Sequence, residues 1–207
     1  MTYLEIAQHY DNCFKKYGDS HLGVDWPNYS DTQKRYKIMF DLMKNENDLN
    51  SDSLLDFGCG LGHFYEWLTL DKKNIPKYTG LDINLSFYEF CKKKFPHLTF
   101  INKDILIDSN IPNFDYIICN GVFTEKRNLT QNEMFDFMSK CLSLLWSKTN
   151  KGIAFNVMSK FVDWERQDLF HVSLDELCWF LKRNLSKEFV IRNDYGLYEY
   201  TIYVYKK

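Results

Sequence analysis

The chain has 207 residues, 45% of them hydrophobic and 26% charged, which is the composition of a globular protein with one core. Its 26 Lys and Arg against 28 Asp and Glu give a net charge of −2, so no basic surface for nucleic acid or an anionic membrane is expected. No apolar run reaches the roughly 18 to 20 residues that span a bilayer, and the first residues do not resemble a signal peptide. We therefore expect a cytoplasmic protein of one domain, residues 1–207, with neither nucleic acid nor a membrane as partner.

The six cysteines stand singly, and no two of them form a CxxC pair. This spacing is typical of reduced thiols in a core rather than of disulfides or a zinc site. We therefore expect no metal and a structural role for all six: Cys13, Cys59, Cys91, Cys119, Cys141 and Cys178.

The pattern of residues 1–50 predicts a helical cap or lid, here called the leader. Residues 51–207 are expected to form the core that follows it. Apolar residues at steps of three or four predict a helix over residues 3–17. A loop with two glycines and a proline follows, and Trp26 lies inside it; loops of this kind often close over ligands. Ser30 and Gln33 have the spacing of a capping box, which predicts a second helix. The apolar face of that helix is Tyr36, Met39, Phe40 and Met43.

After the polar stretch 44–53, strand patterns and helix patterns alternate. This order predicts a largely parallel sheet with helices on both faces. The last two strand patterns are joined by the short turn DYGL, which predicts an antiparallel hairpin at the sheet edge. Seven strands are expected, at 53–57, 78–83, 98–102, 114–120, 152–159, 188–193 and 198–206, with helices from about 62, over 85–95, over 131–147 behind a Thr130–Glu133 capping box, and after Ser173.

The segment LLDFGCGLG, residues 54–62, places a glycine-rich turn between the first strand and the next helix. Glycines allow the backbone to approach a ligand closely, and two classes of cofactor use such a turn. The dinucleotide fingerprint GxGxxG requires a third glycine at position 63, where the chain has His63. Here the glycines follow the spacing GxGxG, two residues after Asp56.

This segment resembles motif I of class I S-adenosylmethionine-dependent methyltransferases, in which an acid precedes GxGxG. Asp82 in TGLDIN matches the family acid that accepts hydrogen bonds from both ribose hydroxyls, and Asp104 in FINKDI matches the acid near the adenine amino group. The resemblance implies a Rossmann-like seven-stranded sheet, mostly parallel with an antiparallel last strand, and S-adenosylmethionine as cofactor, with S-adenosylhomocysteine as product. The implied cofactor-binding residues are Asp56, Gly58, Cys59, Gly60, Gly62, Asp82, Ile83, Asp104, Ile105 and Asn120, with Ile83 and Ile105 sandwiching the adenine.

The ligand's chemistry agrees with this assignment. S-adenosylmethionine is a sulfonium cation without phosphate, so acids at three strand ends are compatible with it, whereas a pyrophosphate would be repelled. The wider chain is similar to a group of small bacterial methyltransferases, which share YG at 17–18, GVDW at 23–26, Arg35 beside Tyr36, and AFN at 154–156. That similarity implies methyl transfer without naming the acceptor.

The fourth strand ends in CNGVF, residues 119–123. Families that methylate amide or exocyclic nitrogens have NPPY or NPPF here, and although Asn120 and Phe123 fit, Gly121 and Val122 do not. Base methylation is therefore not expected. The residues that we expect to contact an acceptor are Trp26, Tyr36, Phe123, Asn156 and Trp164.

Transfer from a sulfonium is a direct displacement, so a base is needed only when the acceptor must lose a proton. Loop positions make His21, Asp25 and His171 the candidates, although a loop histidine often only donates or accepts a structural hydrogen bond. Arg35 could pair with the carboxylate of the cofactor's methionine tail or be an exposed helix residue.

These observations favour methyl transfer to a hydroxyl or amine of a small molecule, such as a sugar or metabolite, because the short leader leaves little room for recognising a macromolecule. A protein or peptide methyltransferase and a non-catalytic cofactor-binding scaffold are the alternatives.

Overall fold

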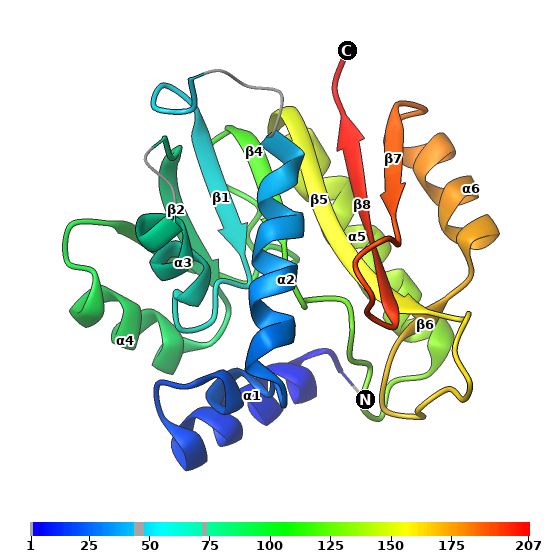
Figure 1. Ribbon diagram of the computed structural model, residues 1–207, viewed down its shortest axis with the longest axis horizontal. Helices are drawn as coiled ribbons and strands as arrows, with labels where there is room; N and C mark the ends of the chain where they lie inside the picture. The colour runs from blue at the N-terminus through cyan, green and yellow to red at the C-terminus, as the bar shows by residue number, and fades with distance from the viewer. Residues whose placement is uncertain (1, 44–47, 72–73) are drawn as a thin grey trace.

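The computed structural model describes residues 2–43, 48–71 and 74–207, and within them one sheet of eight strands forms the centre of the molecule (Figure 1). The strand order is β3-β2-β1-β4-β5-β8-β7, with the short β6 beside β5. The strands are β1 (Ser53–Phe57), β2 (Lys77–Asp82), β3 (Thr99–Asn102), β4 (Phe114–Cys119), β5 (Thr149–Ser159), β6 (His171–Val172), β7 (Phe189–Arg192) and β8 (Glu199–Tyr205).

The first five strands pair in parallel, and β8 runs antiparallel to both of its neighbours, β5 and β7. The carboxyl ends of β1 to β5 therefore meet at one edge of the sheet. In parallel sheets of this kind, ligands bind at that edge. Figure 1 shows the first helix of the chain lying across it.

Helices cover both faces of the sheet. They are α1 (Leu4–Tyr17), the 3-10 turns η1 (His21–Val24) and η2 (Asp41–Met43), α2 (Tyr29–Phe40), α3 (His63–Asp71), α4 (Leu85–Lys94), α5 (Gln131–Ser147) and α6 (Leu174–Asn184). Among the described residues, no helix has the length and apolar character needed to cross a membrane.

Side-chain alternation along the strands divides the core into two clusters. Leu54 and Ile118 belong to a cluster formed with α2 and α3, whereas Leu55 and Ile117 belong to one formed with α5 and α6. Because successive residues of a strand point to opposite faces, each strand serves both clusters. This is the mostly parallel Rossmann-like sheet that the alternating pattern predicts.

Two local predictions differ from the structure. The second helix begins at Tyr29, and its N-cap is Asn28, whose side chain accepts a hydrogen bond from the Ser30 N–H, so the capping box at Ser30 is wrong. Asparagine caps a helix as well as serine does. The sheet also contains β6, whose two residues are too few to produce a strand pattern. Part of the polar stretch, residues 44–47, lies outside the described residues.

Candidate active site

The glycine turn between β1 and α3 bends back onto the end of β2. The N–H groups of Gly58 and Cys59 both donate to the Leu81 carbonyl, at 2.7 and 3.1 Å. Gly58 has φ of +74°, and a Cβ there would lie 2.5 Å from Val122 Cγ2, so only glycine fits between the turn and the loop after β4. The turn therefore leaves bare backbone facing the carboxyl ends of the strands.

Gly62 has a different role from the one expected. It does not line the cavity described below; a Cβ at this position would lie 2.6 Å from the ring of Phe95. Its missing side chain lets the start of α3 pack against the segment after α4.

Asp82, at the end of β2, holds the turn in place. Its Oδ2 accepts the Gly60 N–H at 2.9 Å, and its Oδ1 accepts the Asn84 N–H at 2.8 Å. The carboxyl is 8% exposed, and burial raises its pKa to about 6. Each oxygen retains a second lone pair, so the carboxylate can also accept hydrogen bonds from two ribose hydroxyls.

Asp56 lies at the end of β1. It accepts a hydrogen bond from the Tyr78 hydroxyl at 2.7 Å, and burial together with the nearby Asp82 charge raises its pKa to about 7. A cation entering this region would stabilise the ionised form. The site therefore favours a positively charged ligand over a phosphate.

Asp104 follows β3 and is covered by the first helix. The Tyr3 hydroxyl donates to Asp104 Oδ2 at 2.6 Å, and the Tyr3 ring stacks on Phe137 with centroids 4.8 Å apart. Burial and the acidic partner raise the Tyr3 pKa to about 12, so the phenol stays protonated as a donor. Sequence reasoning missed Tyr3 as a site residue, although it begins the aromatic face of the first helix.

These groups line one cavity of about 1120 Å³, part of which is open to solvent. Ile6, Ala7 and Tyr10 of α1 form one wall. Their spacing is that of a helix face, and sequence reasoning assigned them to a cap without a ligand role. Of the expected residues, the cavity brings together Asp56, Gly58, Cys59, Gly60, Asp82, Ile83, Asp104, Ile105, Asn120, Trp26 and Tyr36.

Asn120 lines the cavity just after β4. Its Oδ1 is buried and has no hydrogen-bond partner in the described part of the chain. Buried polar atoms are nearly always paired in native proteins, so this oxygen indicates a missing donor. A ligand amine or hydroxyl would supply one.

Arg35 does not line the cavity, which corrects its expected pairing with a cofactor carboxylate. Its guanidinium binds the Glu199 carboxylate in two-pronged fashion at 2.8 to 2.9 Å, and lies 4.6 Å from the centre of the Trp26 ring. Glu199 is 1% exposed, so this ion pair is structural.

Asn156 is likewise a positioning residue and not an acceptor contact. It is fully buried on β5, donates to Glu199 at 3.0 Å, and accepts the Gly121 N–H at 2.8 Å. Arg35, Glu199 and Asn156 thus connect the ring of Trp26 to the loop that carries Asn120.

Two other expected acceptor contacts are also corrected. Phe123 is fully buried and packs against Phe137 and Phe155, so it belongs to the core. Trp164 is 73% exposed on the loop after β5 and does not line the cavity. The sequence alone does not distinguish a loop aromatic that is buried in the core or exposed to solvent from one that contacts a ligand.

None of the three candidate bases lines the cavity. His21 Nδ1 forms a hydrogen bond with the Trp26 carbonyl at 2.5 Å, and His171 Nδ1 forms one with the Ser159 carbonyl at 2.6 Å. Asp25 contacts His9 at 2.7 Å and Arg127 at 2.8 Å. His63 does line it, with its Nε2 2.8 Å from Asp19. The rings of His21 and His171 thus each contact a backbone carbonyl, and His171 lies in β6 rather than in a loop.

The parallel sheet, the glycine turn and the acids at three strand ends are the features expected of a class I S-adenosylmethionine-dependent methyltransferase, and the comparisons agree. Residues 54–145 match the family described as "Methyltransferase domain". The chain is 29% identical over 171 residues to a Mycobacterium tuberculosis protein named "Putative methyltransferase Rv1506c", covering 79% of this chain and 99% of the relative. These findings support an S-adenosylmethionine-dependent methyltransferase.

Solved structures show the same fold. Magnesium protoporphyrin IX methyltransferase from Synechocystis PCC 6803 superposes with a TM-score of 0.67 at 16% identity, over 100% of this chain and 98% of the other. An amino pentose methyltransferase from Micromonospora echinaspora gives a TM-score of 0.59 at 14% identity, over 97% of each chain.

Proposed function

We propose that this enzyme transfers the methyl group of S-adenosylmethionine to a hydroxyl or amine of a small molecule, such as a metabolite or a sugar. The observation that carries the proposal is the composition of the cavity lining. Acids and bare backbone from the strand ends form what we call its strand-end side. Aromatic side chains from the leader, Tyr10, Trp26 and Tyr36, form what we call its aromatic side.

The cofactor fits the strand-end side. Asp82 is placed to accept from ribose hydroxyls, and Asp104, with Ile83 and Ile105 also in the lining, fits the adenine end. Gly58 and Gly60 have positive φ and line the cavity, so their bare backbone can face the ligand. The raised pKa of Asp56 suits a cationic ligand, as argued above. These roles are proposals for the residues named.

The aromatic side is left for the acceptor. Trp26 and Tyr36 lie nearly parallel, with ring centroids 6.0 Å apart and planes inclined by 24°, and Arg35 lies over the Trp26 ring. The apolar ring atoms of Trp26 and Tyr36 that line the cavity can pack against a flat ring or the apolar face of a sugar. Asn120 Oδ1, without a partner, can accept a hydrogen bond from an acceptor hydroxyl or amine.

The leader also supports a small acceptor. Ile6 of α1 is buried against the sheet edge, and Tyr3 hydrogen-bonds to Asp104, so the helix itself forms a wall of the cavity. Two of the solved structures carry names with small acceptors, magnesium protoporphyrin IX and an amino pentose, so the fold accommodates acceptors of this size.

Bound S-adenosylmethionine supplies a methyl group on a sulfonium sulfur, and the products are S-adenosylhomocysteine, the methylated acceptor and a proton. The chain's contribution is to orient both reactants in a partly enclosed space. The Arg35–Glu199–Asn156 connection holds the aromatic side and the Asn120 loop at a fixed separation.

The test is to incubate the enzyme with methyl-labelled S-adenosylmethionine and a cell extract, and then to separate the products by mass. We expect label in the low-mass fraction with wild type and much less with Asp82→Asn. Label on protein would overturn the small-molecule proposal in favour of a protein or peptide acceptor. Absence of transfer to any fraction would favour a non-catalytic scaffold.

A further inference from the structure

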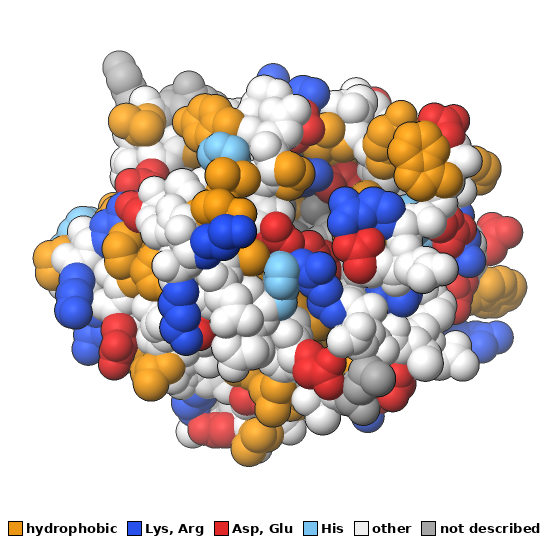
Figure 2. All heavy atoms as spheres, turned by 90° about the horizontal axis from the view of Figure 1, so that it is seen from below, with side chains coloured by type: hydrophobic (Ala, Val, Ile, Leu, Met, Phe, Trp, Pro, Cys, Tyr) orange, Lys and Arg blue, Asp and Glu red, His pale blue; other side chains and the backbone are white. Residues whose placement is uncertain are grey.

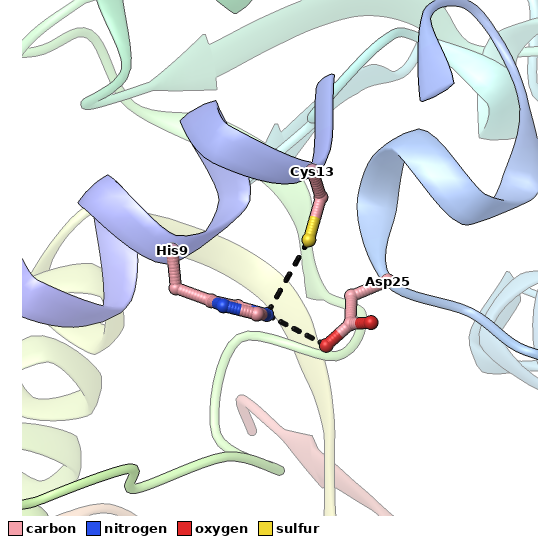
Figure 3. A group of neighbouring side chains, drawn as sticks. All are labelled: His9, Cys13 and Asp25. Carbon is pink, nitrogen blue, oxygen red and sulfur yellow. Dashed lines mark hydrogen bonds and ion pairs between the residues drawn. The ribbon is translucent and has the colours of Figure 1, made fainter. Parts of the chain in front are cut away.

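Three side chains of the leader with metal-binding atoms point toward one another (Figure 3). His9 and Cys13 are one helical turn apart on α1, and therefore project from the same face. Asp25 follows η1 and points toward them. His9 Nε2 lies 2.7 Å from Asp25 Oδ2 and 3.5 Å from Cys13 Sγ. All three donor atoms lie within 4.8 Å of one another.

These separations are close to those of a tetrahedral zinc site. With Zn–N bonds of about 2.05 Å and Zn–S bonds of about 2.3 Å, tetrahedral angles place N and S about 3.5 Å apart. The same geometry places N and O about 3.3 Å apart, so His9 and Asp25 must separate by roughly 0.6 Å. A small side-chain rotation accomplishes this.

The burial of the three donors also suits a metal. Cys13 is buried, whereas the side chains of His9 and Asp25 are 28% and 36% exposed. An ion can therefore enter from solvent, and the thiolate lies on the inner side. Seen from the α1 side, acidic and basic side chains gather beside a hollow in the middle of this face (Figure 2).

A cationic group already occupies this position. The Arg127 guanidinium contacts His9 Nε2, and its Nη2 lies 2.8 Å from Asp25 Oδ2. Its Nε lies 2.6 Å from Glu125 Oε2, and its Nη1 lies 3.7 Å from Asp168. Because Glu125 and Asp168 hold the same guanidinium, it retains partners when an ion takes its place beside His9 and Asp25.

The backbone at this cluster is unusual. Asp25 has φ of +54° and Arg127 has φ of +49°, and they are the two non-glycine residues with positive φ in the described chain. Such conformations are strained for residues other than glycine, and they gather at functional positions. Both strained residues belong to the same cluster.

We propose that His9, Cys13 and Asp25 bind one Zn²⁺ ion, in competition with the Arg127 guanidinium, with the fourth position open to water. Nitrogen, thiolate and carboxylate ligands are the set that zinc prefers. The Cys13 thiol gives up its proton to solvent on binding. This departs from the expectation of no metal, which was based on missing CxxC pairs. The i, i+4 spacing of a histidine and a cysteine on one helix supplies two of the ligands instead.

The ion would link α1 to the segment after η1, and both of these segments form walls of the cofactor cavity. Tyr10 lies between the two helix ligands and lines the cavity, and Val24 and Trp26, which flank Asp25, line it as well. The three ligands themselves do not line the cavity, but the bound ion would hold in place the two segments that enclose it.

The experiment titrates the metal-free full chain with Co²⁺ by absorption and with Zn²⁺ by calorimetry, in the absence of S-adenosylmethionine. We expect one ion per chain and a thiolate-to-cobalt charge-transfer band. Cys13→Ser should abolish the band, and His9→Gln or Asp25→Asn should each weaken Zn²⁺ binding about tenfold or more. Arg127→Gln should tighten binding, because it removes the competing cation.

Matched controls come from the same chain. Cys178→Ser removes a thiol on α6, and His63→Gln removes the histidine of a second cluster, Asp19, His63 and Glu66, which Lys94 already bridges. Neither control should change binding, and circular dichroism checks that every variant is folded. The proposal is overturned if wild type binds no ion, if the band survives Cys13→Ser or is lost in a control, or if Arg127→Gln does not tighten binding. Because no cofactor is present, these outcomes are independent of methyl transfer.

Discussion

Two carboxyl groups that line the cavity, those of Asp56 and Asp82, are almost out of contact with water. Asp56 is 2% exposed and has a pKa raised to about 7, chiefly by burial. Its ordinary value is 3.8, so the folded protein binds this proton more tightly than the unfolded chain does. The stabilising contribution is therefore complete below about pH 4, and is lost as the pH rises through about 7.

Asp56→Asn keeps the shape of the side chain and cannot ionise. Without cofactor, we expect the variant to be more stable than wild type at pH 8, by about 2 to 4 kcal/mol, and to differ little from it at pH 4. Urea unfolding at both pH values measures this difference. A variant that is less stable than wild type at pH 8 would show that the ionised Asp56 is well solvated in the folded state.

Asp82 should determine cofactor affinity. Asp82→Asn retains one acceptor oxygen and removes the charge, and we expect binding of S-adenosylhomocysteine to weaken by about 1 to 3 kcal/mol, or roughly 5- to 150-fold. Calorimetric titration of wild type and variant measures this change. Asp136→Asn, an exposed acid on α5, serves as the control. Equal affinities for wild type and Asp82→Asn would remove Asp82 from the site.

The sequence predicts the position of a residue, though not its role, where that position follows from a strand end. Asp56, Asp82 and Asp104 each follow from a local motif, and all three line the cavity. It failed for Arg35, because the partner Glu199 is 164 residues away and no local pattern joins them. It failed for Phe123 because core packing and ligand contact use the same residue type.

At the scale of elements, α1 forms a wall of the site rather than a separate cap. Its residues Ile6, Ala7 and Tyr10 line the cavity, and Tyr3 contacts Asp104 beside it. We expect bound S-adenosylhomocysteine to slow amide hydrogen exchange in α1 more than in α6, because a ligand suppresses the local openings that expose it. Mass-spectrometric hydrogen exchange with and without ligand measures this effect. A change confined to the glycine turn would contradict a role for α1 as a wall.

The ion pair of Arg35 and Glu199 connects α2 to β8 through buried charges. Removing one partner leaves the other charge buried and uncompensated, so we expect Arg35→Met to cost about 3 to 5 kcal/mol. The double variant Arg35→Met/Glu199→Gln should cost less than the sum of the single variants. Urea unfolding of the full cycle measures the coupling.

Lys140→Met is the control for this cycle. Its exposed pair with Asp136 should contribute no more than about 1 kcal/mol. Strict additivity of Arg35→Met and Glu199→Gln would mean that the two charges do not depend on each other, contrary to their geometry.

The elements themselves were mostly predictable. The Thr130–Glu133 capping box is present at the start of α5, and Ser173 caps α6, because these signals are local. The predicted strand begins at residue 152, whereas β5 begins at Thr149. Asn150 and Lys151 interrupt the apolar pattern of the sequence, but the backbone pairing with β4 includes Thr149. Pairing between strands depends on the neighbouring strand and is absent from local composition.

Across the whole molecule, strand order brings distant motifs to one edge. The parallel pairing of β3, β2, β1 and β4 places three acids and the Asn120 loop around one cavity, and the leader encloses it. The alternation of strands and helices predicts the parallel sheet and the position of the acids at its edge. The enclosure by the leader depends on contacts between α1, η1 and the loop after β4, such as that of Arg127 with Asp25. The sequence does not indicate these contacts.

The most direct test of the account is equilibrium dialysis of the purified protein against labelled S-adenosylmethionine. The account predicts that one molecule is retained per chain, that unlabelled S-adenosylhomocysteine displaces it, and that Asp82→Asn retains much less. Failure of the folded wild-type protein to retain the ligand at millimolar concentration would contradict the assignment of the cavity as a cofactor site.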